Sequence, residues 1–299
     1  CFPKKSSGVL CQATPVKYAL IGKHQQIYGV ARPCAWLHVS ASGFYAWLTR
    51  SKSAPKTAEL DQEIQRCFDA QRGRAGAPRI RHRLVALGRR VSRKTVALRM
   101  RSMGLRARAA RKYKATTNSK HNLPVAPNIL QQNFNAPAAN RVWVSDITYI
   151  WTDEGWLYLA VVLDLYSRAI VGWSINERMT SKLVGDALWM AWWRRLRPKG
   201  VIVHSDRGSQ YCSRDYQQLL QSFGMVCSMS KRGDCYDNAA MESWNHSFKV
   251  EAVHGERFAT RKEAKQMTFE YIELYYNRER LHSRLNYRSP ADFEKLQLA

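Results

Sequence analysis

Acidic residues are scarce in the first half of this 299-residue chain, and long hydrophobic runs are missing from all of it. Residues 1–140 hold 26 lysines and arginines but only four acidic residues, whereas residues 141–299 hold 22 and 19. No apolar run approaches the roughly 18 residues of a membrane-spanning helix, and no signal-peptide pattern opens the chain. The unbalanced positive charge indicates that the front half binds a polyanion, and the lack of an apolar run argues against a membrane protein.

Cysteine pairs are missing as well. The seven cysteines are odd in number and include no C-x-x-C pair, and the eight histidines form no spaced pair with them. We therefore expect reduced thiols in a cytoplasmic protein and no structural zinc module.

Residues 17–50 show the spacing of two or three short helices. The last of these is expected from about Ser42 to Arg50, with Ser40 as its cap. Two helices joined by a tight turn fit DNA binding or plain helical packing equally well.

The second helical segment, residues 55–115, points more strongly to DNA. It predicts a helix over 58–71 and then two more, joined by a turn at 88–92 in which Ser92 is an N-cap. No acid occurs from residue 70 to residue 145, whereas an ordinary solvated surface mixes both signs, so we expect contacts with DNA phosphates. The apolar positions at helical spacing are Leu84, Leu87, Val96, Met100 and Met103. The residues expected to bind DNA are Arg81, Arg83, Arg93, Lys94, Arg99 and Arg101, with Arg89 and Arg90 beside them.

From Arg141 the pattern changes to strands. Three apolar runs that are close in sequence predict an antiparallel meander, and alternating helices and strands follow. Residues 106–140 begin basic and become rich in Pro, Asn and Gln, which is typical of a linker. A helix over 261–277 and a short helix begun by Ser289 and Pro290 are expected near the end.

Three acids in the second half have distinctive flanks: Asp146 in WVSDITY, Asp206 in HSDRGSQY and Glu242 in DNAAMES. The first two lie at apolar strand-like runs, and the third lies in a predicted helix. A single aspartate at a strand end ordinarily serves a turn or a cap. Three carboxylates gathered from distant parts of a chain can instead hold two Mg²⁺ ions for phosphoryl transfer.

These acids and their flanks resemble the D,D,E integrase-core transposases of bacterial insertion sequences, specifically the OrfB product of two-frame elements, with retroviral integrases as more distant relatives. The resemblance runs from about residue 16 to 295. It implies an α/β fold, with a ribonuclease-H-like catalytic core preceded by helical helix-turn-helix DNA-binding units. In that fold the first and fourth strands are neighbours, so Asp146 and Asp206 would meet and Glu242 would approach from a helix.

The resemblance also implies a function. Asp146, Asp206 and Glu242 would be the catalytic residues and the ligands of two Mg²⁺ ions, for which Mn²⁺ should substitute. The reaction would cleave the ends of an insertion sequence and join the 3′ hydroxyl to another phosphodiester. Lys249 matches a basic residue that the family carries seven positions after its glutamate, and is expected to touch DNA. A hydrolysis-only nuclease and a DNA-binding regulator with a silent core are the alternatives.

Partners and domain limits follow from the same resemblance. The expected partners are double-stranded DNA of the terminal repeats and target, at least one further copy of the chain, and an upstream-frame (OrfA) product or a fusion with it, in the nucleoid. Chains of this type usually begin near Val16, so residues 1–15 are interpreted as upstream coding sequence or the seam of a frameshift fusion. The expected divisions are an N-terminal helical segment (1–54), a basic helix-turn-helix domain (55–115), a linker (116–140), the catalytic core (141–255) and a C-terminal helical extension (256–299).

Several residues near the acids have plainer explanations. Asp164 in DLYSR is expected to fix the turn after the second strand, and His204 to be a satisfied structural histidine rather than a proton carrier. Asp237 and Asn238 are expected to cap the helix that carries Glu242. The tryptophans of the preceding helix are expected in the core rather than stacked on bases: Trp189, Trp192 and Trp193.

Overall fold

The computed structural model describes residues 12–52, 57–108, 124–231 and 235–298. The chain divides into two compact units, Cys1–Gln71 with Arg83–Leu105, and Arg72–His82 with Arg106–Ala299. None of the helices in the described ranges is both long enough and apolar enough to cross a membrane. The predicted upstream segment, residues 1–15, lies mostly outside the described residues, as does part of the linker.

The front of the first unit is a cluster of three helices. Its last helix is capped as predicted, because Ser40 Oγ accepts a hydrogen bond from Gly43 N at 3.3 Å. The first begins at Thr14, earlier than predicted, with Pro15 in its first turn. The helices are α1 (Thr14–Tyr28), α2 (Ala31–Trp36) and α3 (Ala41–Lys52). Their shared apolar core consists of Tyr18, Ile21, Cys34, Leu37 and Phe44.

Three further helices follow, as the sequence predicts. Ser92 caps the last of them, since its Oγ accepts from Thr95 N at 3.0 Å. Val96 and Met100 are buried, but Leu87 lies just past the end of its helix and is 75% exposed, which contradicts its place in the apolar spacing. The helices are α4 (Ala58–Ala70), α5 (Ala77–Ala86) and α6 (Arg93–Ser102).

The second unit is built on a five-stranded sheet in the order β3-β2-β1-β4-β5. The first three strands form the predicted antiparallel meander, and β4 runs parallel to both β1 and β5. The first and fourth strands are therefore neighbours, as expected of the ribonuclease-H-like class. The strands are β1 (Val142–Thr152), β2 (Gly155–Asp164), β3 (Ile170–Asn176), β4 (Ile202–Ser205) and β5 (Val226–Met229).

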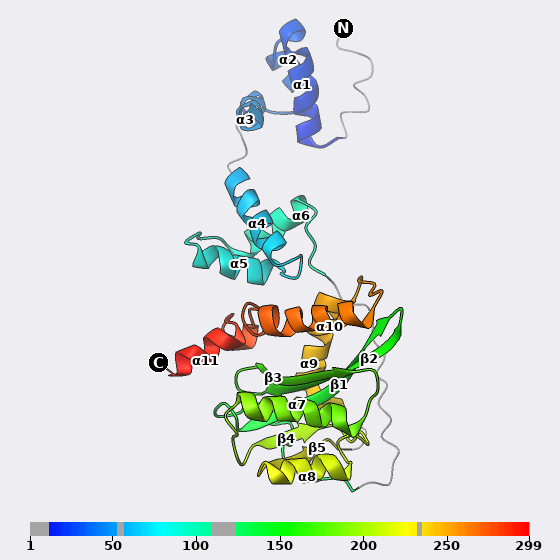
Figure 1. Ribbon diagram of the computed structural model, residues 1–299. Helices are drawn as coiled ribbons and strands as arrows, with labels where there is room; N and C mark the ends of the chain where they lie inside the picture. The colour runs from blue at the N-terminus through cyan, green and yellow to red at the C-terminus, as the bar shows by residue number, and fades with distance from the viewer. Residues whose placement is uncertain (1–11, 53–56, 109–123, 232–234, 299) are drawn as a thin grey trace. The chain divides into compact units, whose positions relative to one another are not determined.

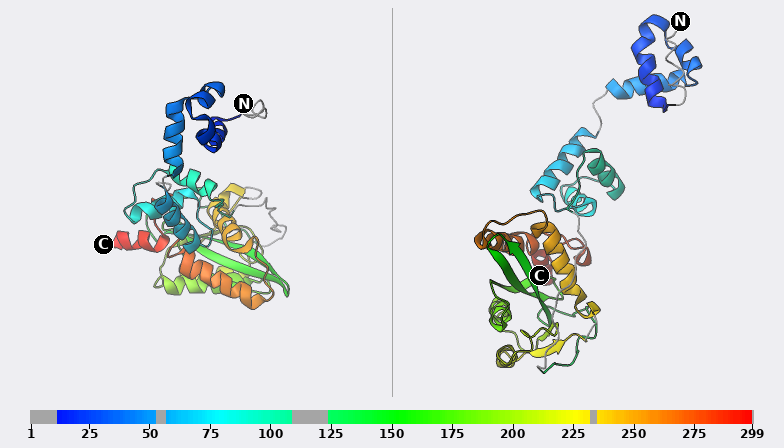
Figure 2. Two further views of the ribbon diagram at one scale, coloured as in Figure 1. Left: turned by 90° about the horizontal axis from the view of Figure 1, so that it is seen from above. Right: turned by 90° about the vertical axis from the view of Figure 1, so that its right-hand side faces the viewer.

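Helices cover both faces of this sheet (Figure 1). On one face α7 and α8 share a core with Trp143 and Val162, and on the other α9 and α10 share a core with Val144 and Val161. The side view in Figure 2 separates these layers. Alternate residues of β1 and β2 thus serve opposite cores, as strand geometry requires. The helices are α7 (Ser181–Arg194), α8 (Arg214–Ser222), α9 (Ala239–Phe248) and α10 (Arg261–Phe269).

Two of these helices continue as π-helical segments. α9 runs into Lys249–Val253, and α10 runs into Glu270–Tyr276, so the predicted helix over 261–277 is confirmed in extent. The short 3₁₀ turn Ser283–Leu285 precedes α11 (Pro290–Leu298). Ser289 caps α11 as predicted, with its Oγ accepting from Asp292 N at 3.2 Å.

Residues 124–140 contain no helix or strand, as predicted, yet they are fastened to the core. Asn128 Nδ2 donates to Asp237 Oδ2 at 2.9 Å, and Ile129 N donates to Ser228 Oγ at 3.0 Å. Leu130 is buried in the core beside α9. The described part of the predicted linker is therefore an integral piece of the core unit.

Candidate active site

Asp146 lies within β1 rather than at its end, opposite Val161 of β2. Its Oδ1 accepts from Ile147 N at 2.9 Å, and its Oδ2 accepts from Asn245 Nδ2 at 2.7 Å. The second bond crosses from the sheet to α9. It orients the carboxylate and ties β1 to the helix that carries Glu242.

Asp206 follows directly after β4, which is parallel to β1 and pairs with it up to Val144 opposite His204. Its Oδ1 accepts from Gly208 N at 2.9 Å. A Cβ on Gly208 would lie only 3.1 Å from that same oxygen. The glycine in HSDRGSQY therefore lets the backbone approach the carboxylate closely enough to hold it.

Glu242 lies in the first turn of α9 and is exposed, and its carboxylate has no hydrogen-bond partner among the described residues. Partial burial still raises the pKa of Glu242. The Glu242 carboxylate belongs to the first turn of the helix, where the helix dipole favours a negative charge.

The three acids act on one another electrostatically. Burial raises the pKa of Asp146 well above its ordinary value, and the charges of Asp206 and then Glu242 raise it further, against the bonds from Ile147 N and Asn245. Even so, no three His, Cys, Asp or Glu side chains in the described part of the chain lie close enough to hold one metal ion together. Repulsion between carboxylates and the exposure of Glu242 both oppose a tighter cluster.

Comparison with known proteins bears on this geometry. The integrase core domain family matches residues 136–235, a second integrase core domain family matches 242–298, and an HTH-like domain family matches 56–113. The transposase InsF for insertion sequence IS3A of Escherichia coli strain K12 is 47% identical over 288 residues, which cover 95% of this chain and 100% of that protein. The chain belongs to the IS3 family of transposases. The predicted resemblance and the ribonuclease-H-like fold class are thereby confirmed.

Other relatives of this transposase include the insertion element IS600 uncharacterized 31 kDa protein of Shigella sonnei, 46% identical over 88% of this chain and 97% of that protein. Among solved structures, a chain of the simian T-cell lymphotropic virus intasome has a TM-score of 0.43 at 15% identity, over 59% of this chain and 60% of that one. The HTLV-2 integrase catalytic core domain, in complex with magnesium, has a TM-score of 0.39 at 15% identity, over 53% and 99%.

Lys249 of the transposase differs from its prediction. It lies on the helix face that also carries Glu242 and Asn245, as its spacing predicts, but its side chain is buried. The ammonium group donates to Tyr149 O of β1 and lies 4.6 Å from the centroid of the Tyr149 ring. Burial lowers the pKa of Lys249 to about 8. β1 therefore covers the amine in this structure, so Lys249 is not a solvated surface lysine, and its contact with DNA stays a prediction.

Asp237 and Asn238 are placed differently from the prediction too. Neither side chain caps α9, whose N-cap has no side-chain hydrogen bond. Asp237 is buried and accepts from Lys231 N at 2.6 Å and from Gln132 Nε2 at 3.0 Å. It therefore fastens residues 128–132 to the loop before α9, a role that depends on a distant segment and that local spacing does not reveal.

Two other structural interpretations are confirmed. Asp164 is buried and accepts from Tyr166 N at 2.9 Å and from Ser167 N at 3.3 Å, which fixes the turn after β2. His204 is buried, with Nδ1 2.9 Å from Ser228 Oγ and Nε2 3.2 Å from Ser230 Oγ. Burial lowers the pKa of His204, so this ring is neutral and hydrogen-bonded.

The tryptophans of α7 are not all in the core. Trp189 is 42% exposed and Trp193 is 52% exposed, so their predicted core positions are wrong. The buried face of α7 instead uses smaller side chains, because the helix lies so close to β3 that a Cβ on Gly172 would be 2.2 Å from Ala187 O. That buried face comprises Leu183, Val184, Ala187, Leu188 and Ala191.

The predicted DNA-binding residues of the helix-turn-helix segment fall into two groups. Arg93, Lys94 and Arg101 are exposed, while Arg81 and Arg83 are half-buried. Arg99 is engaged within the protein, because its Nε donates to Asp61 Oδ1 at 2.6 Å. The bond from Arg99 lowers the pKa of Asp61. The acid that pairs with Arg99 comes from α4, outside the acid-free stretch on which the DNA prediction was based.

Asn245 is the residue near the acids that sequence reasoning missed. It lies three residues after Glu242, so helical spacing places the two on one face. The sequence therefore contained the spacing that places Asn245 beside Glu242. An asparagine three residues from an acid is common, however, and only the fold brings Asn245 to Asp146.

Proposed function

We propose that this transposase cleaves the ends of an insertion sequence and joins the released 3′ hydroxyl to another phosphodiester, with Asp146, Asp206 and Glu242 as its catalytic acids. The observation that carries the proposal is that Asp146 lies on β1, which pairs with the strand that Asp206 directly follows and is bonded through Asn245 to the helix that carries Glu242. Burial first, and then the charges of Asp206 and Glu242, raise the pKa of Asp146. A strongly perturbed carboxylate with two further acids near it, on a strand, a strand end and a helix, is typical of a functional site.

The donor chemistry of the three acids suits a divalent metal, while in this structure they do not lie close enough together to share one ion. Mg²⁺ prefers carboxylate oxygens, and the three acids supply six of them. We expect Asp146, Asp206 and Glu242 to hold two Mg²⁺ ions, with Mn²⁺ as a substitute. When bound, such ions activate an attacking oxygen and stabilise a leaving one.

The surrounding groups then have defined tasks. Asn245 holds Asp146, and the backbone N–H of Gly208 holds Asp206, so each carboxylate keeps one orientation. Because the pKa of Asp146 is raised, protons compete with metal for this carboxylate as the pH falls. Activity at limiting Mg²⁺ should therefore rise with pH.

The DNA contacts and domain limits belong to the same proposal. We assign end recognition to residues 55–115, with exposed Arg93, Lys94 and Arg101 on phosphates and Arg81 and Arg83 beside them. Residues 141–255 form the catalytic core and residues 256–299 its C-terminal extension. Joining two element ends calls for at least two protomers, and an OrfA product or fusion is proposed as the additional partner.

The test is an assay on labelled duplex DNA that bears the element's ends, with and without Mg²⁺. Asp146→Asn should abolish cleavage and joining while DNA binding stays nearly intact. Asp186→Asn, a matched change at an exposed aspartate of α7 that pairs with Lys182, should leave both intact. Near-normal strand transfer by Asp146→Asn in Mg²⁺ would reject the assignment.

The same assay decides between the transposase and its alternatives. A hydrolysis-only nuclease would release nicked DNA without joined product. A regulator with a silent core would bind the ends and give no product in either metal.

A further inference from the structure

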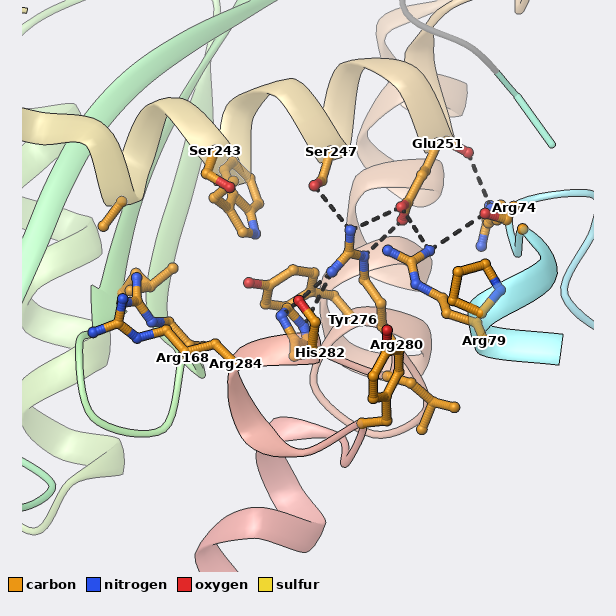
Figure 3. Close-up of a pocket in the computed structure, with 18 of the residues that line it drawn as sticks. Arg74, Arg79, Arg168, Ser243, Ser247, Glu251, Tyr276, Arg280, His282 and Arg284 are labelled. Atoms are coloured by element: carbon orange, nitrogen blue, oxygen red, sulfur yellow. Dashed lines mark hydrogen bonds and ion pairs between the residues drawn. The ribbon is translucent and has the colours of Figure 1, made fainter. Parts of the chain in front are cut away.

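A cavity of about 630 Å³ lies beside α9 in the second unit, and arginine dominates its lining (Figure 3). Ser243 and Ser247 of α9 line it, whereas Asn245, between them in sequence, reaches Asp146. The cavity is therefore a separate feature from the acids, on another face of the same helix. Its arginines are Arg74, Arg79, Arg108, Arg168, Arg280 and Arg284, and its one carboxylate is Glu251.

Part of this charge is already balanced. Glu251 is buried and receives Arg280 Nε at 2.8 Å, Arg79 Nη1 at 3.0 Å and the Tyr271 hydroxyl at 2.9 Å. Arg108 pairs with Glu256 at 2.9 Å. These arginines have a structural role, because carboxylates neutralise their charge.

Arg168 and Arg284 have no such balance. Arg168 has no side-chain hydrogen bond within the described residues, and its Nε is buried without a partner. Arg284 Nη2 donates to Phe134 O and Asn135 Oδ1, both neutral oxygens. Burial first, and then the charge of Arg284, lower the pKa of Arg168 to about 10, against smaller opposing effects of Tyr276 and Asp164. Two cations therefore line one cavity, and Glu251 is the only carboxylate among the described residues that line it.

The backbone at Arg168 is strained in a way that aims this side chain. Arg168 has a φ of 61°, in the left-handed region that favours glycine. Asp164 holds the turn by accepting from Tyr166 N and Ser167 N, and Arg168 N donates to Asp164 O at 2.8 Å. Other non-glycine residues of the described chain share this conformation, Arg197 among them, so the φ fixes where the Arg168 side chain starts but does not by itself assign it a role.

We propose that Arg168 and Arg284 form a subsite for a phosphodiester group of the DNA strand on which the catalytic acids act. A planar guanidinium matches two oxygens of a phosphate, and a buried unpaired cation gains most from such an anion. The Ser243 hydroxyl is a further donor at the rim. Ser243 directly follows Glu242, so the cavity and the proposed catalytic acid lie on different faces of the same turn of α9, and the strand would pass around the helix from one to the other. This inference rests on the proposed function for the choice of strand, but the binding it predicts requires no metal.

The experiment measures binding by the full chain in EDTA, which removes catalysis from the readout. The probe is a fluorescein-labelled duplex with a single-stranded 3′ end, titrated at several salt concentrations. The double variant Arg168→Gln/Arg284→Gln should weaken binding and reduce the salt slope by about 1, since one phosphate contact contributes roughly 0.7 to 0.9. Arg284→Gln alone, at an exposed position that should not disturb folding, should reduce it by about 1.

A matched control and a chemical probe make the test specific to this cavity. Arg197→Gln removes the same charge at the end of α7, on the opposite face of the sheet, and should leave the slope unchanged. Replacing single phosphates by neutral methylphosphonates should weaken wild-type binding at one position and have no further effect at that position in the double variant.

Three outcomes would overturn the proposal. One is an unchanged salt slope in both arginine variants. Another is a methylphosphonate scan in which no position depends on the arginines. The third combines two results: inorganic phosphate stabilises the wild type but not the double variant, and the double variant binds DNA as well as the wild type does. The cavity would then be a site for a free anion. Failure of the proposed function would look different: Asp146→Asn would still cleave in Mg²⁺.

Discussion

At the scale of single residues, the acids of this transposase depend on neutral neighbours for their orientation. Asn245 donates to Asp146 from across the sheet–helix boundary, and Gly208 permits a close backbone approach to Asp206. Neither residue carries charge, so neither stands out in a sequence scanned for metal ligands. Both become visible only when the fold brings β1, β4 and α9 together.

Asn245→Ala should reduce cleavage and joining roughly 10- to 100-fold, the usual cost of losing a group that orients a metal ligand. The Mg²⁺ concentration for half-maximal activity should rise as well, because Asp146 would no longer be held in one orientation. A Mg²⁺ titration of strand transfer measures both effects. Asn176→Ala, at an exposed asparagine ending β3, is the control; equal kinetics for the two variants would mean that the Asn245 bond has no role in the reaction.

Lys249 gives a prediction about pH and stability. Its pKa falls from an ordinary value of 10.5 to about 8 in the folded protein, because burial disfavours the charged form. Between these pH values the unfolded chain binds up to one more proton than the folded chain. The free-energy cost of burying the charged amine is therefore fully present below about pH 8 and is relieved as the pH rises toward 10.5.

The free energy of unfolding of wild type, measured relative to Lys249→Met, should therefore increase by about 3 kcal/mol over that range. Urea titrations at several pH values from 7.5 to about 10.5 measure it. Tyrosines that titrate in the same pH range contribute equally to both proteins, so the comparison with Lys249→Met removes their contribution to the pH dependence of stability. A difference that stays flat with pH would show that the amine is protonated and hydrated in the folded protein.

At the scale of helices and strands, residue spacing predicted which side chains share a helix face, but not what packs against that face. Glu242, Asn245 and Lys249 do share one face of α9, as helical geometry requires. β1 covers that face at Lys249, through a contact with Tyr149 one hundred residues earlier in the chain, and no local sequence pattern predicts such a contact. The tryptophans of α7 failed for a related reason: the tight approach at Gly172 admits only small and aliphatic side chains, so Trp189 and Trp193 remain outside.

The basic helices offer a contrast between two arginine-to-glutamine changes. Arg93→Gln/Lys94→Gln should lower the salt slope of DNA binding by about 2 and leave stability within about 0.5 kcal/mol, because both side chains are exposed. Arg99→Gln breaks the bond to Asp61 that links α6 to α4, so it should lower the melting temperature while changing the slope little. Salt titrations and thermal melts of the full chain separate the effects. The reverse pattern would move the phosphate contact to Arg99.

At the scale of the whole molecule, the meander of the first three strands and the capped helices were predictable from the sequence, and the pairing of the first and fourth strands from the family resemblance. Alternating apolar runs define strands, and Ser40, Ser92 and Ser289 mark helix starts by a local mechanism. The long-range ion pairs were not predictable, because charge partners far apart in sequence carry no spacing rule. Glu251, 172 residues from Arg79, is the clearest case.

Glu251→Gln should lower the free energy of unfolding by about 3 to 5 kcal/mol, since it leaves buried Arg280 with no counter-charge. Glu270→Gln is the matched change at the exposed pair with Arg72, where the loss should stay below about 1 kcal/mol. Urea unfolding of both variants measures the difference. Equal small losses would mean that Arg280 reaches water when its partner is removed.

The ties of Glu251 to Arg79, and of its carbonyl oxygen to Arg74 Nε at 3.0 Å, also bear on how such proteins can be rebuilt. A catalytic core cut out at the first strand, or even at residue 124, would lose two of the cations that neutralise and cover this region. The smallest piece that keeps its charges matched begins before α4, because Arg89 and Arg99 pair with Glu63 and Asp61 of that helix. Exchange of segments between such enzymes, by engineering or by recombination, should therefore succeed at crossover points before residue 58 and fail at the apparent boundary between the helix-turn-helix domain and the core.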